Sequence, residues 1–296
     1  MLSFYTNLVS QGTYLKCKDM SSIVFSPFFA NMYSAPRLAA KFLKYYITAS
    51  NGKGHGIHSP FVFEFVTQVL NDSRQFYAYD GIEQLRQQMR SNNELLTIDD
   101  FGAGSRVAAT KQRSVSSIAA SALKPKKFSQ LFFKIVNHYQ PQTIVELGTS
   151  LGITTSYLAA ANQKGRVVTM EGAKAVAAVA KQNFEALGLT NIEVVQGNFD
   201  DTLPVTLQRL SKVDFAYVDG NHRKEPTLRY FNQLLPYLHA ESILIFDDVH
   251  WSEEMEQAWE TIKADKRVLM TIDLFFIGLV FFKEEFKVKQ DFVIRF

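Results

Sequence analysis

Three aspartates and a histidine stand where two apolar runs end in the C-terminal half of the sequence. Asp219 ends the first run, with His222 three residues later, and the pair Asp247 and Asp248 ends the second. Neighbouring parallel strands lie about 4.8 Å apart, so these carboxylates can converge. Mg²⁺ prefers carboxylate oxygens, and the pattern predicts a divalent metal held by Asp219, Asp247 and Asp248. Histidine is the side chain whose unperturbed charge change falls near neutral pH, so His222 is a candidate general base. An alternative is that the aspartate pair caps the helix expected near Ser252.

A second group of candidate residues lies in the loop Glu146-Leu-Gly-Thr-Ser-Leu-Gly152, between an apolar run and an expected helix. Gly148 and Gly152 allow a tight turn and close approach to a ligand, with Thr149 and Ser150 between them. The loop is not the G-x-G-x-x-G fingerprint of dinucleotide-binding proteins. Its leading carboxylate, Glu146, would repel phosphate but suits the cationic end of a ligand. A plain strand-to-helix turn is the alternative.

Two further sites follow the next expected strands. Glu171 ends the second strand, 25 positions after Glu146, where an acid can accept both hydroxyls of a ribose. Asn198 and Phe199 follow the third strand, and they can read the edge of an adenine and cover its ring. In this order along the chain, the three loops predict one nucleoside-containing ligand.

After Pro141 the sequence alternates between apolar strands and amphipathic helices. Strands are expected at 143–147, 166–170, 192–196, 213–219 and 242–247, with helices at 151–162, 173–187, 201–211, 224–238 and 252–264. The strands are apolar on both faces, as in a parallel sheet covered by helices. A final pair, 267–273 and 277–286, has a short link and is expected to include an antiparallel neighbour. The prediction is an α/β fold with a doubly wound, Rossmann-like sheet.

These residues resemble the class I S-adenosylmethionine-dependent methyltransferases over about residues 126–296. The resemblance implies the strand order 3-2-1-4-5-7-6 with an antiparallel last strand. It also implies that S-adenosylmethionine is the cofactor, with its methionine part at the first loop, its ribose at Glu171 and its adenine beside Asn198 and Phe199. The first loop is most similar to that of the O-methyltransferase branch.

The acids resemble the motif of catechol and caffeoyl-CoA O-methyltransferases, which are metal-dependent. Asp219 and Asp247 match that motif, Asp248 replaces an Asn, and His222 stands where the catechol enzyme has a Lys. The Asp-Gly-x-His sequence is also similar to that of sugar and macrolide O-methyltransferases. The resemblance implies O-methylation of a small hydroxylated molecule, assisted by Mg²⁺. Methylation of RNA or protein, and a non-catalytic cofactor-binding scaffold, are the alternatives.

The N-terminal part of the chain differs from the rest. Residues 1–35 are irregular, and a start at Met32 is an alternative to Met1. Residues 36–125 are expected to form a helical extension, with a flexible loop at 98–116 whose Asp-, Gly- and Ser-rich sequence includes a second acid-glycine segment. The predicted domain boundary lies near residue 125, where the net charge changes from +5 before it to −2 after it.

Composition excludes several other classes of protein. With 47% hydrophobic residues and no apolar run of about 18, the chain is expected to fold without a membrane-spanning helix. A single cysteine forms no intramolecular disulfide, which favours a cytoplasmic location. The charge lacks the dense basic stripe of a nucleic-acid binder. A homodimer is compatible with the sequence.

Overall fold

The computed structural model describes residues 32–100 and 109–296 and is built around one central sheet. Its strand order is β10-β8-β9-β7-β6-β3-β4-β5. The strands are β3 (Thr143–Leu147), β4 (Arg166–Glu171), β5 (Ile192–Gln196), β6 (Phe215–Val218), β7 (Ile243–Asp247), β8 (Met270–Asp273), β9 (Ile277–Phe281) and β10 (Gln290–Val293).

The strand order confirms the predicted 3-2-1-4-5-7-6 arrangement, with one strand added at the edge. Strands β5, β4, β3, β6 and β7 are parallel to their neighbours, whereas β9 is antiparallel to both β7 and β8. The additional strand β10 pairs with β8 in parallel. All five parallel strands therefore deliver their carboxyl ends to one edge, where the predicted loops begin.

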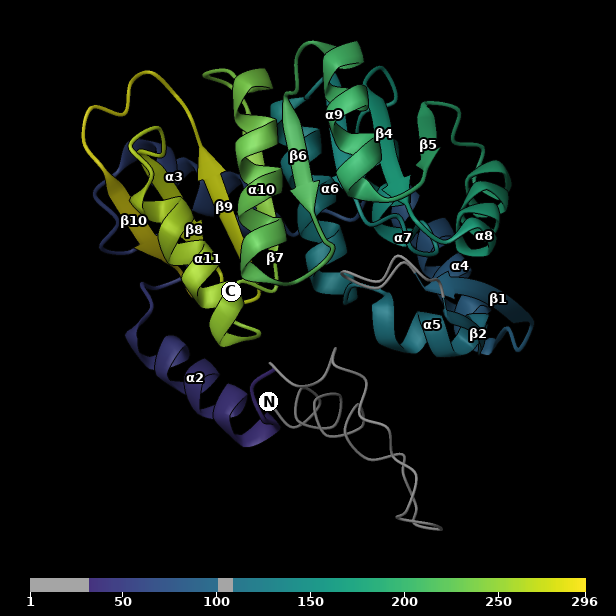
Figure 1. Cartoon of the computed structure of the whole chain (residues 1–296). Helices are drawn as coiled ribbons and strands as arrows, with labels where there is room; N and C mark the ends of the chain where they lie inside the picture. Colours follow the sequence, from purple (N-terminus) through teal and green to yellow (C-terminus); the bar gives the residue numbers. More distant parts are fainter. Residues whose placement is uncertain (1–31, 101–108) are drawn as a thin grey trace.

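Helices cover both faces of this sheet (Figure 1). One face carries α6 (Lys126–Tyr139), α7 (Ile153–Ala161) and α8 (Lys174–Ala186); the other carries α9 (Phe199–Leu210), α10 (Lys224–Leu234) and α11 (Glu253–Ala264). Alternate strand residues point to opposite faces, so Ile144 and Tyr217 join one hydrophobic cluster and Val145 and Val218 join the other. The inner strands of the sheet are thus buried on both sides, as their apolar sequences predict, whereas the edge strands β5 and β10 are partly exposed.

The segment before residue 125 packs onto the first of these faces. It contains α2 (Ala35–Thr48), α3 (Pro60–Glu64), the π-helix η2 (Phe65–Leu70), α4 (Ala78–Ser91), β1 (Leu95–Asp100), β2 (Ala109–Ser114) and α5 (Val115–Ala122). Phe65 of η2 and Ile118 of α5 belong to the same buried cluster as Ile144 of the central sheet. The hydrophobic core therefore continues across the predicted boundary near residue 125.

The structure differs from the flexible loop expected at 98–116. The described part of that range contributes to the antiparallel hairpin β1–β2 and to the start of α5. The hairpin has few apolar side chains in alternation, so its sequence resembles a loop more than a strand. Residues 101–108, with the second acid-glycine segment, lie outside the described residues, as does the predicted irregular stretch up to residue 31.

Helix α2 connects the N-terminal segment to the C-terminal end of the chain. Leu38 and Tyr45 of α2 are buried with Phe275. The Tyr45 hydroxyl donates to the Ile294 carbonyl oxygen at 2.5 Å and accepts from the Phe296 amide at 3.1 Å. No helix in the described part of the chain is long and apolar enough to cross a membrane.

Candidate active site

Asp219, His222 and Asp247 are brought together at the carboxyl edge of the sheet. Strands β6 and β7 pair in parallel, with Val218 opposite Phe246, so the residues that follow in each strand are neighbours. The Tyr217 hydroxyl donates to Asp219 Oδ2 at 2.9 Å. His222 Nε2 lies 3.5 Å from Asp219 Oδ1 on the other side of the carboxylate. The acid-histidine pair predicted from spacing is therefore a pair in space.

Lys124 supplies a positive charge to this cluster. Its ammonium forms an ion pair with Asp247 Oδ1 and lies 3.6 Å from Asp248 Oδ1. The Lys124 and Asp247 side chains are only 9% and 3% exposed. Burial lowers the pKa of Lys124, but Asp247, Asp248 and Asp219 together raise it above its ordinary value. The ammonium is therefore charged, as an ion pair with a buried carboxylate requires.

Burial also acts on the two carboxyl groups. Loss of solvation raises the pKa of Asp219, although Lys124 and a hydrogen bond with Asp247 oppose the rise. The pKa of Asp247 is raised further, by burial and then by the charges of Asp219 and Asp248. Carboxyl groups whose pKa values are raised by burial and by neighbouring negative charge occur both in functional sites and in structural buried pairs.

The magnesium site predicted for Asp219, Asp247 and Asp248 does not fit this arrangement. Across residues 32–100 and 109–296, the acidic, histidine and cysteine side chains form no group of three or more that could hold a metal ion. The cation against Asp247 and Asp248 is an ammonium of the chain itself. The donor set therefore does not favour a divalent ion at these aspartates, and metal use stays a prediction.

The alternative assignment of the aspartate pair to a helix cap is wrong. Helix α11 is capped by Ser252, whose hydroxyl accepts from the Met255 amide at 3.1 Å. Asp248 instead lies in the turn after β7 with a φ of 53°, a conformation that is uncommon for residues other than glycine. Its amide donates to the Phe276 carbonyl oxygen at 2.6 Å, which holds that turn against the loop before β9.

The glycines of the first loop make close contacts with the protein. Gly148 has a φ of 108°, and a Cβ there would lie 2.0 Å from the carbonyl oxygen of Asp219. Gly152 has a φ of 80°, and a Cβ there would lie 2.5 Å from the Phe184 ring of α8. Sequence reasoning predicted glycines that approach a ligand; the structure shows that they let the β3–α7 loop pack against the end of β6 and against α8.

Glu146 is a buried carboxylate in which only one of the two oxygens is hydrogen bonded to the described residues. Its Oε2 accepts from Thr155 Oγ1 at 2.5 Å and from Thr169 Oγ1 at 2.7 Å. Its Oε1 is buried and finds no hydrogen-bond partner among the described residues. Burial raises the pKa of Glu146 to about 7. Since buried polar atoms are nearly always partnered, the free oxygen is suited to a ligand donor.

Glu171 closes the same loop from the neighbouring strand. Its Oε2 accepts from the Ser150 amide at 2.9 Å and its Oε1 from the Ala173 amide at 2.9 Å. Burial raises the pKa of Glu171 while these amide hydrogen bonds lower it. A carboxylate has about four lone-pair positions, so each oxygen can still accept a hydroxyl.

Thr149 and Ser150 serve the loop in different ways. The Thr149 and Thr169 hydroxyls hydrogen bond to each other at 2.6 Å, so Thr149 helps to fix the loop on β4. The Ser150 hydroxyl is buried, and within the described chain it has no hydrogen-bond partner. Ser150 Oγ is thus the second polar atom here, after Glu146 Oε1, that a ligand could satisfy.

Asn198 and Phe199 start helix α9 after the third strand. Asn198 Oδ1 caps that helix by accepting from the Asp200 amide at 3.0 Å. The Phe199 ring lies over Gly220, where a Cβ would come within 2.5 Å of it, and 6.2 Å from the Tyr230 ring. Phe199 therefore borders the loop of Asp219, as a side chain that covers one wall of a ligand site would.

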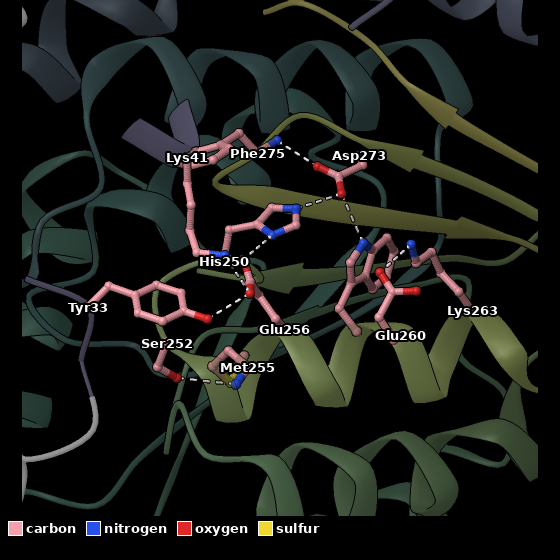
Figure 2. Close-up of polar contacts among 11 residues, drawn as sticks. Tyr33, Lys41, His250, Ser252, Met255, Glu256, Glu260, Lys263, Asp273 and Phe275 are labelled. Carbon is pink, nitrogen blue, oxygen red and sulfur yellow. Dashed lines mark hydrogen bonds and ion pairs between the residues drawn. The ribbon is translucent and has the colours of Figure 1, made fainter. Parts of the chain in front are cut away.

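His250, which lies shortly after the end of β7, belongs to a network separate from that of His222 (Figure 2). Its Nε2 lies 2.8 Å from Asp273 Oδ2 and its Nδ1 lies 3.0 Å from Glu256 Oε1. Glu256 also accepts from the Tyr33 hydroxyl and from the Lys41 ammonium, at 2.7 and 2.9 Å. The network joins the N-terminal segment to α11 and β8 and has a structural role.

Lys124 and Tyr217 are the residues that sequence reasoning missed. Tyr217 precedes Asp219 by two positions, so it points to the same side of the strand, and that spacing could have found it. Lys124 is followed in the sequence by Pro125 and then by two further lysines, Lys126 and Lys127. No spacing in the sequence separates it from its exposed neighbour Lys126, because its burial depends on the tertiary fold.

A mostly parallel sheet with this strand order, an acid-glycine loop after its first strand and an acid after its second agree with the arrangement that the resemblance to class I methyltransferases implies. Residues 145–249 match the family model described as a methyltransferase domain.

Curated relatives agree with this match. The chain is 30% identical to a catechol O-methyltransferase of Niastella koreensis over 148 residues, which is 48% of this chain and 65% of that protein. It is 30% identical to a catechol O-methyltransferase of Mycobacterium tuberculosis over 153 residues, covering 51% of this chain and 66% of that one. The match thus spans slightly less than two thirds of each relative's length.

A solved structure gives the same fold. The SAH-bound methyltransferase PaMTH1 of Podospora anserina has a TM-score of 0.54 and 15% sequence identity, covering 69% of this chain and 88% of that one. The chain therefore carries a match to a methyltransferase domain at residues 145–249, and over about half of its length it is similar to curated catechol O-methyltransferases.

Proposed function

We propose that this protein transfers the methyl group of S-adenosylmethionine to a hydroxyl oxygen of a small molecule. The observation that carries the proposal is the contact between two loops: Gly148 packs so closely on Asp219 that a Cβ would lie 2.0 Å from its carbonyl oxygen. The loop expected to hold the cofactor and the acid-histidine pair therefore share one edge of the sheet. The catechol O-methyltransferase relatives support an oxygen acceptor.

The residues present suit S-adenosylmethionine. In this proposal Glu146 Oε1 and Ser150 Oγ, both buried and unpartnered within the described residues, receive the polar groups of its methionine part. Glu171 accepts the ribose hydroxyls. Asn198 and Phe199 border the adenine, while Gly148, Thr149 and Gly152 hold the loop in shape. The cofactor supplies an electrophilic methyl group on sulfur.

His222 is the proposed general base. With Nε2 3.5 Å from Asp219 Oδ1, the imidazole is held by a carboxylate at the end of β6. His222 would take the acceptor's hydroxyl proton as the oxygen bonds to the methyl carbon, while the carbon–sulfur bond breaks and its electron pair stays on the sulfur of the departing S-adenosylhomocysteine. Asp219 would stabilise the imidazolium that results. Much of the rate comes from holding the oxygen in line with the methyl group.

Calorimetric titration with S-adenosylhomocysteine tests the cofactor assignment. We expect one site per chain, and Glu171→Ala should weaken binding about 10- to 100-fold, because a charged acceptor of hydrogen bonds is lost. Glu185→Ala, on the exposed face of α8, is the matched control and should leave binding unchanged. Absence of binding by the wild-type protein would remove the proposal.

The same preparations test the reaction. A panel of catechols, hydroxycinnamates, sugars and macrolides is incubated with labelled S-adenosylmethionine, with and without EDTA. Transfer to at least one hydroxyl is expected, and His222→Ala should lower that rate about 100- to 10,000-fold while S-adenosylhomocysteine still binds. Unchanged turnover in His222→Ala would remove the histidine from the chemistry.

A further inference from the structure

Lys124 lies at the position where the acid cluster needs a cation. It comes from the connection between α5 and α6, far in sequence from β6 and β7, yet its ammonium pairs with Asp247 and lies 3.6 Å from Asp248 Oδ1. Its side chain is only 9% exposed. An ammonium in such a place is retained by its partners, because an unpaired buried charge is costly.

The backbone of Lys124 is fixed by buried neighbours. Arg86 of α4, itself 2% exposed, donates from Nη1 to the Lys124 carbonyl oxygen at 2.6 Å. Arg86 Nη2 also donates to Ser129 Oγ of α6 at 3.2 Å, and Arg86 Nε donates to Glu83 Oε1 at 2.9 Å. Lys124 is therefore held from the main-chain side as well as through its ammonium, and it is not a surface lysine that happened to fold inward.

The neighbouring lysine gives a direct comparison. Lys126 is exposed and begins α6 two residues later, so the two side chains carry the same charge in the same connection. Only Lys124 is buried. The burial of Lys124 therefore follows from its ion pairs with the acid cluster, and not from a general tendency of this basic segment to be buried.

We propose that Lys124 is the resident cation of the acid cluster, in the place of the divalent metal that the sequence predicted for Asp219, Asp247 and Asp248. It acts as a positioning residue: it holds Asp247 and Asp248 beside Asp219, so that the Asp219–His222 pair keeps its geometry. Methyl transfer then proceeds without a metal. The effect on turnover rests on the proposed function, whereas the effect on metal binding does not.

Metal binding is measured first, with Mn²⁺ as the probe and the free-ion electron paramagnetic resonance signal as the readout. Wild-type protein should leave that signal unchanged. Lys124→Met should bind one Mn²⁺ per chain at least about 10-fold more tightly than the wild type does, because Asp247 and Asp248 lose the ammonium that pairs with them and their carboxylates become free to bind an added ion. Lys126→Met is the matched control and should behave as the wild type. Tight binding of one Mn²⁺ by the wild type that Asp247→Asn abolishes would overturn the proposal, and so would a Lys124→Met variant that folds and binds no more Mn²⁺ than the control.

A second comparison keeps the test decisive if Lys124→Met folds poorly. Lys124→Arg keeps the positive charge and should retain a thermal midpoint near that of the wild type, whereas Lys124→Met should lower it. Adding Asp247→Asn to Lys124→Met should recover part of the loss, since the unpaired charge is removed. Equal loss in the Arg and Met variants, with no recovery in the double variant, would show that Lys124 only fills space.

Turnover gives the last readout. With an accepted hydroxyl substrate, EDTA should leave the wild-type rate unchanged, and Lys124→Arg should keep more activity than Lys124→Met. A rate abolished by EDTA and restored by Mg²⁺ would overturn the proposal. Failure to bind S-adenosylhomocysteine would count against the proposed function alone, because the Mn²⁺ measurement needs neither cofactor nor acceptor.

Discussion

At the scale of single residues, His250 is held between two carboxylates and its charge depends on pH. Its ring lies 2.8 Å from Asp273 and 3.0 Å from Glu256, and it stacks on Phe275 with ring centres 5.2 Å apart. Burial lowers the pKa of His250, but the hydrogen bonds and charges of Asp273 and Glu256 raise it above the ordinary 6.5. The pKa values of Asp273 and Glu256 are lowered in turn.

The direction of the pH effect follows from these shifts. A histidine whose pKa is raised by folding contributes stability that is complete below pH 6.5 and is lost as the pH rises through the folded value. The two carboxylates contribute above their ordinary values of 3.8 and 4.5 and lose that contribution in acid. The network is therefore strongest in weakly acidic solution.

His250→Gln should lower the free energy of unfolding by about 1–3 kcal/mol near pH 5.5, because charge-assisted hydrogen bonds to two carboxylates are lost. The difference from the wild type should shrink as the pH rises toward 9. Urea denaturation at a series of pH values measures it, with the exposed His55→Gln as control. A difference that does not change with pH would show that His250 is neutral in the folded protein.

At the scale of elements, the β3–α7 loop depends on backbone conformations that only glycine adopts easily. Gly148 combines a φ of 108° with the 2.0 Å approach of the Asp219 carbonyl oxygen to its missing Cβ. Gly188, at the end of α8, also has a positive φ of 66°, but nothing lies within 4 Å of its missing Cβ. A comparison of the two glycines therefore distinguishes the cost of an unfavourable backbone conformation from the cost of a steric clash.

Gly148→Ala should therefore cost more than Gly188→Ala. At Gly188 we expect about 1 kcal/mol from conformation alone. At Gly148 a backbone shift at the end of β6 is added, which should move Asp219 and weaken S-adenosylhomocysteine binding at least about 10-fold. Urea denaturation and calorimetry on both variants check this. Equal effects of the two substitutions on S-adenosylhomocysteine binding would show that the contact between Gly148 and Asp219 does not influence the site.

The elements of the sheet were predictable to the extent that their sequences carry a pattern. Strands β3 and β7 are buried apolar runs and β5 is a half-buried one, and their expected ends agree with the structure within one residue. The hairpin β1–β2 has a polar sequence, so nothing distinguished it from a loop. Neighbouring strand ends explain why Asp219 was correctly placed beside Asp247, since parallel pairing alone brings them together. Lys124 reaches them through the packing of α4, α5 and α6, which no local pattern records.

At the scale of the whole molecule, the sequence before residue 125 and the α/β part share one core. Phe65 of η2 is fully buried and lies 5.6 Å, between ring centres, from Phe281 of β9. Helix α2 is fastened to the other end of the chain through Tyr45 and Ile294. Division of the chain by net charge therefore does not imply two units that fold separately.

We accordingly expect the chain to unfold in a single cooperative transition. Trp259 is buried in the α/β part, whereas Trp251 packs against the cluster that α2 forms with Phe275. In a Trp251→Phe background the tryptophan fluorescence therefore reports on the α/β part, whereas far-ultraviolet circular dichroism reports on all helices. The two signals should coincide in urea. Phe65→Ala, made in the N-terminal segment, should shift the tryptophan transition by about 3–5 kcal/mol because it opens a cavity against β9. Phe63→Ala, in the adjoining helix α3 and 48% exposed, is the control and should shift it little. Two separate transitions, or a tryptophan signal that Phe65→Ala leaves in place, would show instead that residue 125 marks a true boundary between independently folding domains.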